Sequence, residues 1–208
     1  MNEQKAMTQK TYQTSHGTIV YWIGEPTAEI AKSQQQSVQA KRSLIFLPGL
    51  TADHRLFDKQ IEVFSLTCQV LTWDPPGHGL SRPFSLDFSL MDQAAWLREI
   101  LDREGIRRPV LVGQSMGGYV SQCFLELYPD VAGGFLSIDS APLQRRYVTA
   151  AEIWLLKRAG TIYRLYPWKQ LQKAGATGCA CTGYGRRLMR SFLESYSKEE
   201  YCELAQHG

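Results

Sequence analysis

The sequence predicts an α/β protein with a mostly parallel sheet, an N-terminal antiparallel hairpin and helices on both faces of the sheet. Two observations support this fold class. Short apolar runs alternate with segments of helical periodicity through the middle of the chain, which is the pattern of strands and crossover helices in a parallel sheet. After Asp139 the alternation stops and only helical segments follow, which indicates an added helical layer.

The predicted elements begin with a hairpin. Residues 11–15 and 18–23 are rich in β-forming side chains and flank His16-Gly17, where glycine can supply the positive φ of a tight turn. Residues 25–42 contain a glutamine triplet and almost no large apolar side chain, so they predict a solvated connection to the main body.

Four apolar runs predict strands that are buried on both faces, at residues 43–47, 70–73, 110–112 and 135–138. Helices are expected between them, at residues 56–64, 90–104 and 116–127. The second of these helices places its apolar residues at steps of three and four, which predicts one buried face: Leu90, Ala94, Leu97, Ile100 and Leu101.

The C-terminal part of the chain predicts a helical cap. Helices are expected at residues 148–158, 168–174, 186–192 and 198–206, with breaks at Pro167, at 175–178 and around 183–185. We therefore divide the chain into a core of residues 1–143 and a cap of residues 144–208.

Composition excludes several function classes. The 208 residues are 44% hydrophobic and 21% charged, a balance that can bury a core. Lysine and arginine number 23 against 20 acidic residues, giving a formal charge of +3, and the basic residues are scattered in pairs, which argues against a nucleic-acid surface. No apolar run approaches the roughly 18 residues that span a bilayer, and no apolar stretch follows the N-terminus, so we expect a cytoplasmic protein.

The cysteines predict no disulfide framework, because they are five in number and irregularly spaced. Cys179-Ala-Cys181 is the only close pair, and no second Cys/His pair stands at metal-ligand spacing. We expect no metal and no organic cofactor.

The strongest functional signal is the segment Gly113-Gln114-Ser115-Met116-Gly117-Gly118, a GxSxG motif between a predicted strand and a predicted helix. That context is the one a strained serine nucleophile requires. The Met116 amide, at the start of the helix, would point toward an oxyanion formed beside Ser115. The alternative is a glycine-rich turn with an ordinary capping serine.

With these residues the chain resembles the α/β-hydrolase family over essentially its whole length. Leu47-Pro48-Gly49-Leu50-Thr51 follows the first buried strand, where the family has its oxyanion loop, and the resemblance implies that the Leu50 amide is the second oxyanion donor. Pro48 stands where the family usually has histidine. Because the donor is a backbone amide, this change need not abolish the oxyanion hole.

A second family motif, D-x-x-G-x-G-x-S, is matched by residues 74–81. The resemblance implies a structural role, so we expect Asp74 and His78 to hold a turn near the site entrance. Serine at position 115, where dehalogenases and epoxide hydrolases of this fold carry aspartate, favours chemistry through a serine ester.

The family's triad continues with an acid and a histidine after two further strands, and residues 144–208 contain no segment typical of those strands. Four residues are candidate partners: His207 follows a helix, His54 lies near the oxyanion loop, Asp139 ends a strand, and His78 lies in the turn. None makes a convincing partner for Ser115. We therefore expect the N-terminal part of a longer hydrolase, inactive alone; the alternative is a natural short chain, either split or degenerate.

The first hypothesis is a serine hydrolase that acts on a small or medium acyl ester or thioester through a Ser115 acyl-enzyme. Two alternatives stay open: a non-catalytic binding protein of this fold, and an acyltransferase, which would use the same serine. An acyl pocket or packing of the cap could equally explain four aromatic residues: Trp154, Tyr163, Tyr166 and Trp168. The oligomeric state is not predicted.

Overall fold

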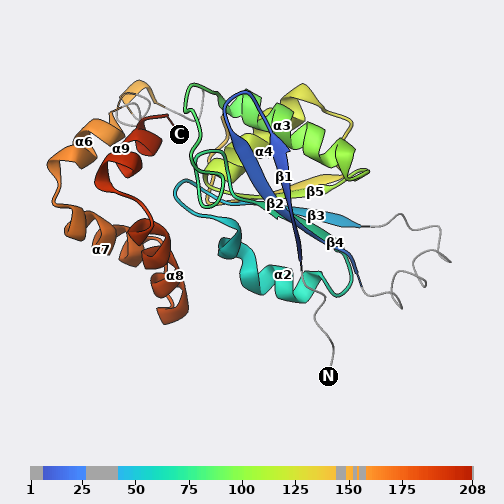
Figure 1. The fold of residues 1–208 in the computed structure, drawn as a ribbon, viewed down its shortest axis with the longest axis horizontal. Helices are drawn as coiled ribbons and strands as arrows, with labels where there is room; N and C mark the ends of the chain where they lie inside the picture. Colours follow the sequence, from blue (N-terminus) through green and yellow to red (C-terminus); the bar gives the residue numbers. More distant parts are fainter. Residues whose placement is uncertain (1–6, 27–41, 144–148, 152–153, 155–157, 208) are drawn as a thin grey trace.

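A computed structural model describes residues 7–26, 42–143, 149–151, 154 and 158–207 (Figure 1). Its centre is a six-stranded sheet of order β1-β2-β4-β3-β5-β6. The strands are β1 Thr8–Gln13, β2 Thr18–Gly24, β3 Ser43–Leu47, β4 Gln69–Trp73, β5 Val110–Gln114 and β6 Gly134–Ile138. β3 pairs in parallel with β4 and β5, and β5 with β6, whereas β2 is antiparallel to both β1 and β4. The predicted fold class is confirmed.

The N-terminal hairpin is confirmed, although β1 ends at Gln13 instead of continuing to residue 15. The Thr14 hydroxyl causes this early end, because it accepts hydrogen bonds from the backbone N–H groups of His16 and Gly17 at 3.0 and 3.1 Å. Gly17 has φ 151° and packs against Phe84, where a Cβ would clash. The connection expected at residues 25–42 lies mostly outside the described residues.

Helices cover both faces of the sheet (Figure 1). The helices α3 Leu90–Arg103 and α4 Met116–Leu127 pack on one face, with Ile45 and Leu111 in the same core cluster. The helix α2 Asp58–Phe64 and the short 3₁₀ helix η1 His54–Phe57 pack on the other face, against Phe46 and Val112. Neighbouring residues of one strand thus enter different cores, which explains why β3, β4 and β5 are continuous apolar runs.

One strand departs from its prediction. β6 was expected to be buried on both faces, but Leu136 is 53% exposed and Ile138 39%. Within the part of the chain that the structure describes, β6 pairs only with β5. Its other edge and much of its surface therefore contact no other described element.

After β6, the structure describes four helices over their full length, and they lie beside the sheet at the side where the parallel strands end (Figure 1). They are α6 Ala159–Leu165, α7 Trp168–Gly178, α8 Gly183–Glu194 and α9 Lys198–His207. In this segment, called here the C-terminal helices, α6 packs mainly on α9, and α7 on α8. The helix expected at 148–158 lies partly outside the described residues, and α6 was not predicted.

Two predicted glycine breaks are wrong. α7 continues through residues 175–178, because Gly175 lies close to Leu193 of α8 and its missing side chain permits the contact. α8 starts at Gly183, before the expected start at residue 186, because the Thr182 hydroxyl accepts a 3.0 Å hydrogen bond from the Gly185 N–H.

Arg82 joins the C-terminal helices to the core. Its guanidinium lies 4.4 Å from the centre of the Tyr196 ring and donates two 3.1 Å hydrogen bonds to the Ser195 carbonyl. Glu200 adds an ion pair at 3.6 Å. These three contacts of the Arg82 guanidinium hold the start of α9 against the segment that follows β4.

Among the described residues, no helix combines the length and the apolar character that a membrane crossing needs. All five cysteines are free thiols.

Candidate active site

Ser115 occupies the sharp turn between β5 and α4 with φ 49° and ψ −115°. A side chain at positive φ is strained, and such residues concentrate at functional sites. Neighbouring elements hold the turn in place: the Ser115 N–H donates to the Ile138 carbonyl at 2.9 Å, and the Ser115 carbonyl accepts from the Gly118 N–H at 2.9 Å. Ser115 therefore occupies a strained turn between a strand and a helix.

Three glycines of the motif lie where the turn leaves no room for a Cβ atom. A Cβ at Gly113 would collide with the backbone of Gly117, and one at Gly117 would collide with the Leu47 carbonyl. A Cβ at Gly118 would collide with the Ser140 hydroxyl. The start of α4 therefore packs directly on β3, β5 and the residues that follow β6.

The loop after β3 passes directly against the elbow. A Cβ built on Gly49 would lie 3.1 Å from the Ser115 Cβ and would collide with the Gln114 side chain. Leu50 and Met116 both line one small cavity of about 10 Å³. The two residues whose amides were predicted as oxyanion donors thus border the same cavity, with Pro48 in the loop.

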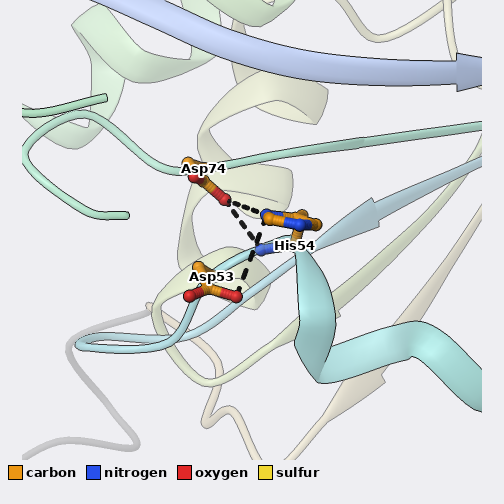
Figure 2. A group of neighbouring side chains, drawn as sticks. All are labelled: Asp53, His54 and Asp74. Atoms are coloured by element: carbon orange, nitrogen blue, oxygen red, sulfur yellow. Dashed lines mark hydrogen bonds and ion pairs between the residues drawn. The ribbon is translucent and has the colours of Figure 1, made fainter. Parts of the chain in front are cut away.

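Asp74, the first residue of the D-x-x-G-x-G-x-S segment, is completely buried and serves as a hydrogen-bond hub (Figure 2). Its Oδ1 accepts from the backbone N–H of His54 at 2.9 Å and lies 2.7 Å from the ring Nδ1 of His54. Its Oδ2 accepts from the Leu80 N–H at 2.6 Å. The Ser81 hydroxyl donates to the Asp74 carbonyl and accepts from the Val20 N–H, both at 2.8 Å. These bonds agree with the expected structural role of Asp74.

Asp53, His54 and Asp74 offer ligand atoms within 4.8 Å of one another, which is close enough to hold a metal ion. However, Arg55 already occupies both Asp53 oxygens, with contacts of 2.6 to 3.2 Å. Both Asp74 oxygens also accept hydrogen bonds, and the His54 ring stacks on Trp22 with centroids 3.7 Å apart. The group is a satisfied hydrogen-bond network that fixes the start of η1.

His78 is buried in the turn, as expected, and its Nδ1 lies 2.9 Å from the Pro76 carbonyl oxygen. Burial lowers the pKa of His78 to about 4, although the bond to Pro76 and the charge of Asp74 act in the opposite direction. The ring is therefore neutral at pH 7, with its hydrogen on Nδ1, because a carbonyl oxygen can only accept. Its Nε2 is an acceptor with no partner among the described residues.

The residues that the structure describes do not assemble a triad around Ser115. In the part of the chain that it describes, no histidine ring forms a hydrogen bond to the Ser115 hydroxyl. Asp139, a candidate partner from the sequence, is exposed at the end of β6. His207 ends α9, and its side chain lies outside the described residues.

The aromatic residues of the C-terminal helices mostly pack or face solvent. Tyr163 and Trp168 pack on Tyr201 of α9, with centroids 5.7 and 5.3 Å apart. Trp154 and Tyr166 are each 55% exposed. These contacts favour the packing alternative.

A groove of about 940 Å³ lies between the segment after β4 and the helices α6 and α9. Charged side chains of both signs line it, among them Arg82, Arg164, Glu200 and Glu203. Leu86 and Leu204 line both this groove and the small cavity beside Leu50 and Met116. The groove therefore adjoins the small cavity that Met116 lines.

Sequence reasoning missed Gln93, which is 3% exposed and lines the small cavity. A signal was present: Gln93 stands three residues after Leu90 and four before Leu97, so the helical period places this polar residue on the apolar face of α3. The contact between His54 and Asp74 had no such signal, because twenty residues separate them.

A mostly parallel α/β sheet with a serine in the sharp turn between β5 and α4 defines the class of protein. The family model described as alpha/beta hydrolase fold matches residues 42–178. The chain belongs to this family.

Several known proteins are similar to this chain, and the similarity covers a different share of each of them. A curated relative, the (E)-2-((N-methylformamido)methylene)succinate hydrolase of Acinetobacter baylyi, is 26% identical over 125 residues, which are 60% of this chain and 43% of that protein. A thermophilic esterase from Thermogutta terrifontis superposes with TM-score 0.71 at 17% identity, covering 97% of this chain and 71% of the esterase. A hydrolase from Pseudomonas aeruginosa also gives 0.71 at 18% identity, covering 96% and 72%. The two structural similarities show the fold, and the chain spans less than half the length of the curated relative.

Proposed function

We propose that this protein is a serine hydrolase that cleaves a small or medium acyl ester or thioester, with Ser115 as the nucleophile. The observation that carries the proposal is the backbone of Ser115, held at φ 49° and ψ −115° between β5 and α4. Strain of this kind persists only where the surrounding structure enforces it. Three glycines and the residues after β6 enforce it here.

In the proposed reaction, the Ser115 Oγ attacks the carbonyl carbon of the substrate and forms a C–O bond, while a base removes the hydroxyl proton. The amides of Leu50 and Met116 donate to the oxyanion. The intermediate collapses, the bond to the alcohol or thiol breaks, and the leaving group takes the proton. Water then attacks the acyl-enzyme and releases the acid, which regenerates the Ser115 hydroxyl.

A histidine oriented by a carboxylate is the base that this chemistry needs. Neither His54 nor His78 takes this role in the proposed reaction. The Nδ1 of His54 binds Asp74 in the network at η1, and the His78 ring is buried with its Nδ1 on Pro76.

The substrate class follows from the groove and the relatives. A volume of about 940 Å³ is in the range of small-molecule sites. The similar proteins include an esterase and a succinate-derivative hydrolase. Within this proposal, residues 144–208 form a cap over the groove, and the partner is a small acyl substrate in the cytoplasm.

Covalent labelling of the protein purified from its source cell tests the proposal. A fluorophosphonate forms a bond between phosphorus and the serine oxygen as fluoride leaves. We expect one label on Ser115, none in Ser115→Ala, and undiminished labelling in Ser137→Ala, which changes an exposed serine of β6.

Absence of the label on the source protein would overturn the proposal and favour a binding protein of this fold. The missing hydrogen bond between Ser115 and any described histidine is the observation that favours this second candidate. Product analysis with an added alcohol separates hydrolysis, which releases the acid, from acyl transfer, which forms a new ester.

A further inference from the structure

Two residues that line the same small cavity each carry a buried polar atom without a partner among the described residues. The Nε2 of His78 and the Oε1 of Gln93 are fully buried and form no hydrogen bond among the described residues. Both residues line the cavity of about 10 Å³. Buried polar atoms are nearly always paired in folded proteins, so two unpaired atoms at one cavity indicate that something else binds there.

Both atoms accept hydrogen bonds and neither donates. His78 Nδ1 carries the ring hydrogen, since it faces the Pro76 carbonyl at 2.9 Å, and this leaves Nε2 as a bare acceptor. Gln93 Oε1 is an amide oxygen. The group that completes the site must therefore bring hydrogen-bond donors.

The other lining residues restrict the size and position of that group. Apart from His78 and Gln93, the cavity is lined by apolar residues: Leu50, Pro76, Leu86, Phe88, Met116 and Leu204. Its volume corresponds to about one water molecule, which admits a single hydroxyl or amino group. Because Leu50 and Met116 supply the proposed oxyanion donors, a group in the cavity would be only a few bonds from the reacting carbonyl.

We propose that His78 and Gln93 form a polar subsite that selects acyl groups with a hydroxyl or amino substituent close to the carbonyl. A water molecule fills the subsite when no substrate is bound. The substituent enters from the groove past Leu86 and Leu204, which line both spaces. This inference rests on the proposed function, because it describes which acyl group the Ser115 site accepts.

Substrate selectivity tests the subsite. We would compare p-nitrophenyl 3-hydroxybutyrate and 3-aminobutyrate with 3-methylbutyrate, which carries a methyl group at the same carbon. We expect the source protein to favour at least one donor-bearing ester by roughly tenfold or more in kcat/KM. Gln93→Leu should lose this preference, because the subsite then lacks one acceptor.

Thr72→Val is the matched control. The Thr72 hydroxyl is also buried without a partner, but Thr72 is absent from the lining of the cavity. This variant should keep the preference of the wild type. Equal or lower kcat/KM for both donor-bearing esters would overturn the inference and leave a structural water only, and loss of the preference in Thr72→Val would also contradict it.

A second measurement separates failure of the subsite from failure of the proposed function. In ¹⁵N-labelled protein, the Nε2 signal of His78 should shift when 3-hydroxybutyramide or 3-aminobutyramide is added, but not with 3-methylbutyramide. The His16 signal serves as the reference. A shifted His78 signal without turnover of any ester would support the subsite and overturn the proposed Ser115 catalysis. A His78 signal that no amide shifts would overturn the subsite.

Discussion

The hydroxyl of Ser140, just after β6, donates a 2.9 Å hydrogen bond to the carbonyl of Ser115 at the start of α4. This carbonyl also accepts from the Gly118 N–H, while the Ser115 N–H donates to Ile138. The backbone of Ser115 is therefore bonded on both sides of the residue. The end of β6 and the first turn of α4 hold one strained position in place.

Replacing Ser115 by glycine should relieve this backbone strain and thereby stabilise the protein. A non-glycine residue in such a conformation costs about 1–3 kcal/mol, and glycine returns part of that through greater freedom of the unfolded chain. We expect Ser115→Gly to raise the free energy of unfolding by about 1 kcal/mol in denaturant titrations. Ser137→Gly, in the extended backbone of β6, should lower it by about 0.5–1 kcal/mol. A loss of stability in both variants would show that the elbow is unstrained.

Close packing of α4 on β3 predicts a large penalty at Gly117. Gly117→Ala places a methyl group on the Leu47 carbonyl, which should destabilise the protein by about 1–3 kcal/mol. Gly178→Ala is the control, because nothing lies within 4 Å of its Cβ position at the end of α7. That variant should gain up to about 1 kcal/mol. Thermal unfolding of both variants checks the prediction, which fails if they behave alike.

The buried ring of His78 predicts that stability falls in mild acid. Its pKa is about 4 in the folded protein and 6.5 as the ordinary value, so the unfolded chain binds more protons between these pH values. Stability therefore decreases as the pH falls through this window, by up to roughly 3 kcal/mol at its lower end.

Denaturant unfolding at several values between pH 7 and pH 5 avoids the range in which most carboxylates titrate, and comparison with a His78 variant then isolates the effect of this ring. The slope of stability against pH should be smaller in His78→Gln than in the wild type. Equal slopes would mean that the His78 ring is not protected from protonation.

The contacts of Arg82 predict that the helices α8 and α9 become more mobile when its planar guanidinium is replaced. Arg82→Lys keeps the charge but cannot make both hydrogen bonds to Ser195 while stacking on Tyr196. We expect faster amide hydrogen exchange in α8 and α9, with β3 to β5 unchanged. Arg98→Lys is the control, since Arg98 pairs with Asp102 within α3 at 2.8 Å. Exchange that rises equally in the sheet would point to global destabilisation instead.

The sequence predicted the parts of the fold that local patterns encode. β3, β4 and β5 were recognisable in the sequence because their side chains pack on both faces of the sheet, so that most residues of each strand are apolar. The glycines at residues 175–185 were misread, because packing on Leu193 and the Thr182 cap decide whether a helix tolerates them. The exposure of β6 depends on what lies beside it, which its five residues do not encode.

The candidate site divides in the same way. The Ser115 elbow is encoded within six consecutive residues, so its geometry could be predicted. The bond between His54 and Asp74 and the shared cavity of His78 and Gln93 arise only when separate elements meet. Gln93 was nevertheless marked by its polarity on an apolar helix face.

The C-terminal helices pack mainly on one another and are joined to the core by cationic side chains on aromatic rings, among them Arg55 on Phe192 and Arg82 on Tyr196. The sequence of helices attached in this way can change during evolution without repacking of the sheet. Mutations in α6–α9 can thus alter which molecules enter the groove while the backbone geometry at Ser115 stays constant. The architecture separates the evolution of selectivity from the preservation of chemistry.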